Sequence, residues 1–125
     1  MNKRTLLASG IFLMALGVAL GAFGAHALKA SLTASGRLET YELAIRYLMI
    51  HALALLILGL LVDAHSRLHL SGTFILAGIL FFSGSLLTLS LTNNPIWGAV
   101  APVGGTSFIL GWLWAGYVVL KDQAT

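Results

Sequence analysis

Among the residues of this 125-residue chain that could do chemistry, His51 is the most informative. It lies within an apolar stretch, and Tyr47 precedes it by four residues, which places both side chains on one face of a helix. Such a histidine could titrate near neutral pH and line a small pocket or a short water path. It could equally hydrogen-bond a serine or a free carbonyl and fix helix packing, because interhelical hydrogen bonds are common although each contributes only about 0.6 kcal/mol. The residues alone leave both interpretations open.

Other polar or helix-perturbing residues are expected at a similar depth. Pro102 should bend the last apolar stretch and free the carbonyl of Gly98, because proline has no N–H. His26 should cap a helix end or contact lipid headgroups. We therefore predict a polar pocket in the outer half of the molecule. Its candidate residues are His26, Tyr47, His51, Ser83, Ser85, Thr88, Pro102, Gly104, Gly105 and Thr106.

Metal-dependent and nucleophilic chemistry find less support. His65 and His69 form an H-x3-H pair near Asp63, and on a helix both would face one way and could bind a metal. The neighbouring Ser71 and Gly72 favour a loop instead, and the chain has no cysteine to complete such a site. No carboxylate is expected deep in an apolar stretch. The sequence therefore predicts no catalytic residue, no metal and no cofactor.

The polar residues must be positioned by helices that cross a membrane. The chain is 58% hydrophobic and only 9% charged, whereas a soluble domain has about 25% charged residues. Four apolar stretches have close to the ~20 residues that a helix needs to span hydrocarbon, and they run over residues 5–25, 44–62, 73–91 and 96–120. The expected fold is all-α: an integral membrane four-helix bundle, forming one domain over residues 1–125, with its N- and C-termini on the same side.

The ends of these stretches carry three further expectations. Lys3-Arg4, the apolar run and Ala25-His26-Ala27 resemble a cleavable signal peptide, but the run is longer than the roughly 7–15 residues of such a segment. The second helix should begin before residue 44, where Glu42 and Arg46 are spaced for an ion pair. Cytoplasmic termini are favoured by the Lys/Arg balance between the two sides, which is Lys3, Arg4, Arg67 and Lys121 against Lys29, Arg37 and Arg46.

Aromatic and small residues complete the expected arrangement. Trp112, Trp114 and Tyr117 are expected at the cytoplasmic interface, where amphipathic rings gather. Because lipid is as apolar as leucine, close backbone approach at small residues must hold the helices together. In the first stretch these residues are Gly10, Gly17, Gly21 and Gly24, with Gly17 and Gly21 forming a GxxxG pair. Such contacts could close within one bundle or between subunits.

Four ordered motifs are distributed along nearly the whole chain. They are Gly21-Ala22-Phe23-Gly24-Ala25-His26-Ala27-Leu28-Lys29, then Tyr47-x-x-x-His51-Ala52-Leu53-Ala54, then Phe82-Ser83-Gly84-Ser85-Leu86, and finally Ala101-Pro102-Val103-Gly104-Gly105 with Gly111-Trp112. They resemble the motifs of the YgdD/YwdK-like family of small bacterial inner-membrane proteins of unknown function. The resemblance implies four spans and a location in the bacterial cytoplasmic membrane, and it implies no activity, ligand or catalytic residue.

Three classes of function can be compared on these observations. Abundant packing glycines, minimal loops and the lack of a deep carboxylate favour a non-enzymatic structural or accessory membrane component, in a homo-oligomer or a larger membrane complex. The alternative is a small channel or ligand-binding bundle that uses the pocket around His51, with an unknown ligand. An enzyme is least favoured, because no recognised nucleophile–base spacing is present. The lipid bilayer is the expected partner, and a scattered net charge of +3 gives no reason to expect nucleic acid.

Overall fold

The computed structural model describes residues 1–122 and contains, over those residues, helices and no strands. Residues 123–125, which the predicted single domain includes, lie outside this description. In chain order the elements are α1 (Lys3–Ala25), α2 (Lys29–Ser35), α3 (Leu38–Leu61), α4 (Leu68–Gly78), the π-helical segment η1 (Ile79–Ser83), α5 (Gly84–Thr92), the 3-10 segment η2 (Pro95–Ala99) and α6 (Ala101–Lys121).

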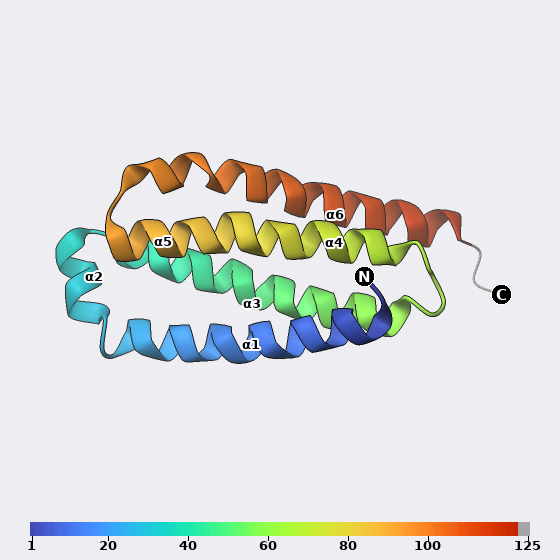
Figure 1. The fold of residues 1–125 in the computed structure, drawn as a ribbon, viewed down its shortest axis with the longest axis horizontal. Helices are drawn as coiled ribbons and strands as arrows, with labels where there is room; N and C mark the ends of the chain where they lie inside the picture. Colours follow the sequence, from blue (N-terminus) through green and yellow to red (C-terminus); the bar gives the residue numbers. More distant parts are fainter. Residues whose placement is uncertain (123–125) are drawn as a thin grey trace.

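The long helices run side by side along the length of the molecule (Figure 1). Within residues 1–122 four helical stretches are long and apolar enough to cross a membrane, formed by α1, α3, the continuous α4–η1–α5, and η2 with α6. This confirms the predicted all-α, four-helix membrane class. We call the end that holds residues 1–3, 62–67 and Asp122 the terminal end, and the end that holds residues 26–37 and 93–100 the α2 end.

The two edge helices are much less covered than the central ones. In Figure 1, α1 and α6 lie at opposite edges, and α3 and α4–η1–α5 lie between them. In their most apolar stretches, 17% of the residues of α1 and 22% of those of the α6 span are buried, against 50% for α3. Large apolar faces of α1 and α6 are therefore open to the surroundings, which a chain of this composition tolerates only in lipid.

Packing of α1 on α3 follows a seven-residue repeat. Gly10, Gly17 and Gly24 are buried against α3, and a Cβ atom at these positions would overlap Leu56, Met49 and Tyr41, respectively. Such spacing is typical of left-handed helix pairs. Gly21 behaves differently, because a Cβ there would meet only Ile45 Cγ2 at 3.7 Å, an ordinary contact. The predicted GxxxG pair is therefore not the unit of packing, and the close contacts recur every second turn.

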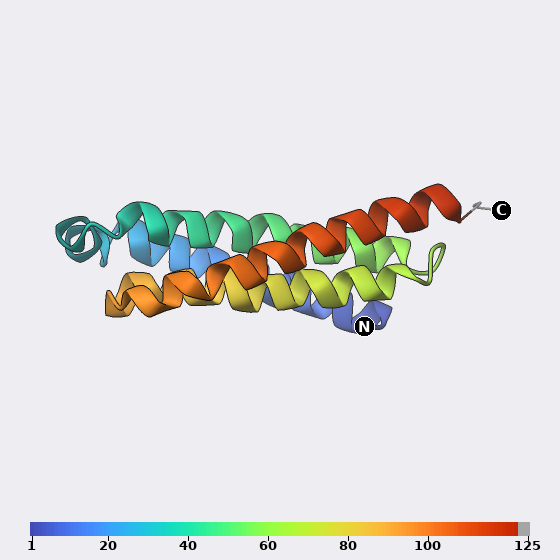
Figure 2. The ribbon, with the colours of Figure 1, turned by 90° about the horizontal axis from the view of Figure 1, so that it is seen from above.

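α6 packs obliquely across α4 and η1 (Figure 2), also through glycines. Phe108 of α6 lies against Gly78, and Ile75 of α4 lies against Gly111. Gly104 approaches the opposite helix most closely, because a Cβ there would come within 2.6 Å of the carbonyl carbon of Phe81. The Ser107 hydroxyl adds a hydrogen bond of 2.7 Å to the carbonyl of Phe74.

The fold differs from the sequence predictions at two helix starts. α4 begins at Leu68, so Ser71 and Gly72 are helical and buried rather than in a loop. Pro102 does not bend a continuous helix, because the 3-10 segment η2 precedes it and α6 starts at Ala101. Proline is favoured in the first helical turn, where its missing N–H would have had no helical partner.

Ion pairs tie the loop at the terminal end to both edge helices. Asp63 pairs with Lys3 of α1, and Arg67 pairs with Asp122, directly after α6. The indole N–H of Trp114 donates to the carbonyl of Arg67 at 3.1 Å. The hydrogen bond from Arg67 holds the pKa of Asp122 below its ordinary value. At the terminal end, the loop over residues 62–67 is thus bonded to both α1 and α6.

This geometry predicts an acid-sensitive attachment of α6. A carboxyl whose folded-state pKa is depressed stabilises the fold fully above its unfolded pKa, about 3.9, and loses that contribution as pH falls through the folded pKa. A spin label at Lys121→Cys, the only cysteine in such a variant, should therefore gain mobility below about pH 4. Asp122→Asn should give the mobile spectrum at every pH, while Asp63→Asn should not. An Asp122→Asn spectrum identical to that of the parent would contradict this assignment.

Candidate functional site: the groove around His51

His51 is fixed by two hydrogen bonds near the middle of α3. Its Nδ1 lies 2.8 Å from the carbonyl oxygen of Tyr47, and its Nε2 lies 3.1 Å from Nε1 of Trp112 in α6. An indole N–H can only donate, so Nε2 must accept and the ring proton belongs on Nδ1, from which it donates to Tyr47. The partners therefore select the neutral Nδ1–H tautomer.

Aromatic rings surround this imidazole. The ring of Phe108 stacks on it, with centroids 3.6 Å apart and an interplanar angle of 15°. The ring of Tyr47 lies beside Phe82, with centroids 4.6 Å apart. This stacking explains why His51 is 5% exposed although it sits at the side of the bundle. Hydrogen bonds and ring contacts together join α3, η1 and α6 at one level.

A hollow of about 360 Å³ lies beside these rings, and we call it the His51 groove. Its lining consists of Tyr47, His51, Phe82, Gly105, Phe108, Ile109 and Trp112. Ile109 and Trp112 are 60% and 47% exposed, so the groove opens sideways, toward what would be lipid. Within residues 1–122 the Tyr47 hydroxyl makes no hydrogen bond, which leaves one polar group at the groove for a ligand.

The chemistry available to His51 is limited by its partners. A proton added at Nε2 would turn that atom into a donor facing the Trp112 donor, so protonation requires the indole to rotate away. The region has no carboxylate to orient the imidazole and no nucleophile bonded to it, within residues 1–122. The arrangement suits packing or the binding of an apolar ligand with one polar group better than acid–base catalysis.

Hydroxyl groups of the predicted pocket are used within their own helices. Ser85 donates to the carbonyls of Phe81 and Phe82. Thr88 and Thr106 each donate to the carbonyl four residues earlier. Ser85 thereby donates to two carbonyls of the π-helical segment η1, where the regular i to i+4 hydrogen bonds of an α-helix are interrupted. None of these three residues lines the His51 groove.

The remaining candidates lie on other surfaces. His26 is exposed at the end of α1, where its backbone N–H caps the helix. Ser83 is buried, and its hydroxyl has no partner within residues 1–122. It lines a different, smaller hollow, to which α1 and α3 also contribute side chains. Pro102 and Gly104 serve the start and the packing of α6. The structure thus brings together Tyr47, His51 and Gly105 of the predicted set.

Of the groove residues that come from α6 and η1, sequence reasoning found Gly105 and missed Phe82, Phe108, Ile109 and Trp112. Trp112 was expected at an interface, whereas it donates to His51 near the middle of α6. Gly105, Phe108 and Trp112 recur at intervals of three and four residues, which is a helical face. That periodicity could have identified these three residues from the sequence. No sequence pattern could have identified Phe82, because only tertiary packing places it next to Tyr47.

The histidines of the H-x3-H pair do not converge. His65 lies in the loop before α4, 3.5 Å from Asp122, and His69 is exposed within α4. Over the described part of the chain, no group of three or more His, Cys, Asp or Glu side chains is arranged to hold a metal.

Comparison with known proteins gives a consistent family. Residues 20–105 match the family described as "Protein of unknown function (DUF423)". A UPF0382 membrane protein of Staphylococcus aureus (strain bovine RF122 / ET3-1) is 44% identical over 99 residues, which covers 78% of this chain and 80% of that protein. UPF0382 membrane protein YwdK of Bacillus subtilis (strain 168) is 41% identical over 101 residues, 78% of this chain and 81% of its own.

A Gram-negative relative extends the match. UPF0382 inner membrane protein YgdD of Escherichia coli (strain K12) is 40% identical over 114 residues, with 85% of this chain and 83% of that protein covered. No solved structure matches the chain significantly. The predicted YgdD/YwdK-like resemblance is thereby confirmed, and with it the multi-pass membrane character of the fold. The chain belongs to the DUF423 family of membrane proteins of unknown function.

Proposed function

We propose that this protein is a non-enzymatic structural or accessory component of the bacterial cytoplasmic membrane, which acts by lateral contact with other membrane components. The observation that carries this proposal is the contrast between its interior and its edges. Polar side chains around His51 are bonded to one another or to their own helices, so few are left for chemistry. The edge helices α1 and α6, in contrast, present wide apolar faces.

The terminal half of the bundle supports a contact role over a conducting one. Its core is a continuous cluster of apolar side chains, including Leu6, Leu55, Leu58, Ile75 and Val118. Water would have to cross this cluster to pass through the bundle, and apolar constrictions of this kind remain dry. In reconstituted vesicles the full chain should therefore give no proton or ion flux above that of empty vesicles. Measurable flux would contradict the proposal.

Purification from the native membrane tests the contact role directly. The tagged full chain, extracted in mild detergent, should bring down a membrane component in fixed proportion, identified by mass spectrometry. If the partner contacts the exposed apolar face of α6, the double variant Ile109→Ala, Leu113→Ala should recover less of the co-purifying component. The matched control is Ile57→Ala with Leu53→Ala on the central helix α3, which are similarly exposed. Catalytic turnover by the purified chain would refute the proposal.

A second candidate, binding of a small apolar ligand, is favoured by the His51 groove. Gly105→Leu should fill the groove with little strain, because a Cβ at Gly105 meets Phe82 only at 3.8 Å. If the groove binds a ligand, this variant should lose a small molecule that co-purifies with the parent. Gly116→Leu is the matched control, since a Cβ there has open space around it.

Orientation belongs to the same proposal. We propose that the terminal end faces the cytoplasm, because Lys3, Arg4, Arg67 and Lys121 lie there. The α2 end carries Lys29, Arg37 and Arg46. A periplasm-dependent alkaline phosphatase fused after the last residue should be inactive, and one inserted at Gly36 should be active. The opposite pattern would invert the orientation.

A further inference from the structure

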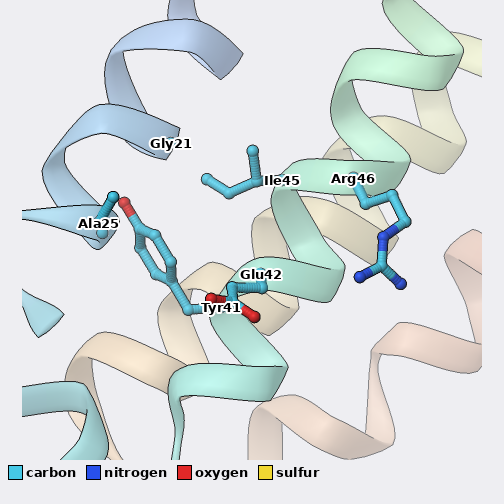
Figure 3. A pocket seen from close by; sticks show the side chains of 7 residues that line it. Gly21, Ala25, Tyr41, Glu42, Ile45 and Arg46 are labelled. Carbon is cyan, nitrogen blue, oxygen red and sulfur yellow. The ribbon is translucent and has the colours of Figure 1, made fainter.

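A second hollow, of about 210 Å³, lies between α1 and α3 at the α2 end. Its lining is Gly21, Gly24, Ala25, Tyr41, Glu42, Ile45 and Arg46. Figure 3 shows the ring of Tyr41 reaching from α3 toward α1, with Ile45 directed toward Gly21. The hollow is separate from the His51 groove, with which it shares no lining residue.

Gly21 explains why this hollow exists. The spaces above Gly10, Gly17 and Gly24 are filled by side chains of α3, whereas only the Cγ2 methyl of Ile45 approaches Gly21, at 3.7 Å from where a Cβ would lie. Tyr41 cannot move in to fill the space, because its hydroxyl donates to the carbonyl of Leu20 at 2.5 Å and its side chain is 1% exposed. The protein thus leaves a recess on its lateral surface.

The charges at the rim of the recess are unpaired. Glu42 and Arg46 were expected to pair with each other, yet among residues 1–122 neither has an ion-pair partner. Both side chains are exposed. In Figure 3 Arg46 extends from the side of α3 away from Gly21, with its guanidinium turned toward the start of α3, and its long exposed side chain can reorient toward the recess that it helps to line. One cation and one anion therefore line an apolar recess near the α2 end, from which long charged side chains can reach lipid headgroups.

We propose that this recess binds a phospholipid whose headgroup combines a phosphate with a primary ammonium, the phosphoethanolamine class. The phosphate would contact Arg46, whose planar guanidinium binds phosphate with two parallel hydrogen bonds. The ammonium, an ethylene link away, would contact Glu42, and the glycerol with the upper acyl chain would fill the space over Gly21. This inference does not depend on the proposed function or on the His51 groove.

Charge complementarity selects this lipid over its common alternatives. An anionic lipid without an amine would satisfy Arg46 and leave Glu42 facing a net negative headgroup. A trimethylated choline headgroup carries the positive charge but has no N–H to donate to the carboxylate. The neighbouring charged side chains on this end, Lys29, Arg37 and Glu39, do not line the recess, and Arg37 is bonded to Asn93.

Native mass spectrometry of the purified full chain tests this assignment. Ethanolamine, glycerol and choline phospholipids with identical acyl chains would be added separately. The parent protein should retain the ethanolamine lipid about tenfold more strongly than either competitor, a ratio expected when one charge-assisted hydrogen bond is gained. Arg46→Gln should reduce retention of all three lipids, whereas Glu42→Gln should abolish the preference while leaving overall retention.

Steric variants separate binding from folding. Gly21→Leu should fill the recess and remove retention, with an unchanged melting temperature, because the added Cβ makes only an ordinary contact. Gly116→Leu and Glu39→Gln serve as controls and should retain the lipid normally. Equal retention of the three lipids, or retention by Gly21→Leu, would overturn the proposal. So would a disulfide-linked dimer of Gly21→Cys in native membranes, because a second copy would then occupy the recess.

Discussion

Gly104→Ala should destabilise the protein by about 2 kcal/mol, although alanine is normally about 1 kcal/mol better than glycine within a helix. The reason is that a Cβ at Gly104 would lie 2.6 Å from the carbonyl carbon of Phe81 and 2.7 Å from Cα of Phe82. Both are backbone atoms and cannot rotate away as a side chain would. α6 would have to separate from η1, and the contacts of Phe108 and Ser107 would loosen with it.

The matched control is Gly116→Ala, on the same helix but on a face that does not contact η1. A Cβ at Gly116 has no neighbour within 4 Å, so this variant should be as stable as the parent or slightly more stable. Unfolding can be followed by denaturant titration in micelles or by the melting temperature in lipid nanodiscs. Equal stability of the two variants would show that α6 does not approach η1 as closely as described.

His51 should contribute more through its ring than through its hydrogen bonds. His51→Phe keeps a ring against Phe108 and removes both hydrogen bonds. It should cost about 1 kcal/mol in all, of which the interhelical bond to Trp112 accounts for roughly 0.6 kcal/mol. His51→Ala also removes the stacked ring and leaves a cavity, so its cost should reach about 3 kcal/mol. The same unfolding measurements distinguish the two values.

A double-mutant cycle isolates the bond between the two helices. Trp112→Phe alone should cost about 0.6 kcal/mol. When combined with His51→Phe it should cost less than the sum, because the same hydrogen bond is lost only once. Strict additivity would mean that the indole N–H does not bond His51 in the bilayer. A much larger cost for His51→Phe than for Trp112→Phe would point to an essential role of the imidazole itself.

The candidate site was partly accessible from the sequence. Tyr47 and His51 share a face because they are four residues apart on one helix, and that is a local property. Phe82 joins them only because the π-helical segment packs against α3 and α6. Ser85 and Thr88 were expected in the same pocket by depth alone. The depth of a residue in the membrane does not predict the direction of its side chain. The hydroxyls of Ser85 and Thr88 donate to carbonyls of their own helical stretch.

Four membrane-spanning helices could be predicted from the sequence, because the length and composition of an apolar stretch are local properties of one helix. The family could be predicted from the order and residues of four short motifs. The role of each glycine, in contrast, depends on how the helices pack together. Gly104 and Gly116 occupy one helix, and Gly17 and Gly21 another, yet one member of each pair is tightly packed and the other faces open space or a recess. Periodicity gives the spacing of small residues on a helix, but the rotation and register of its neighbour determine which of them is filled.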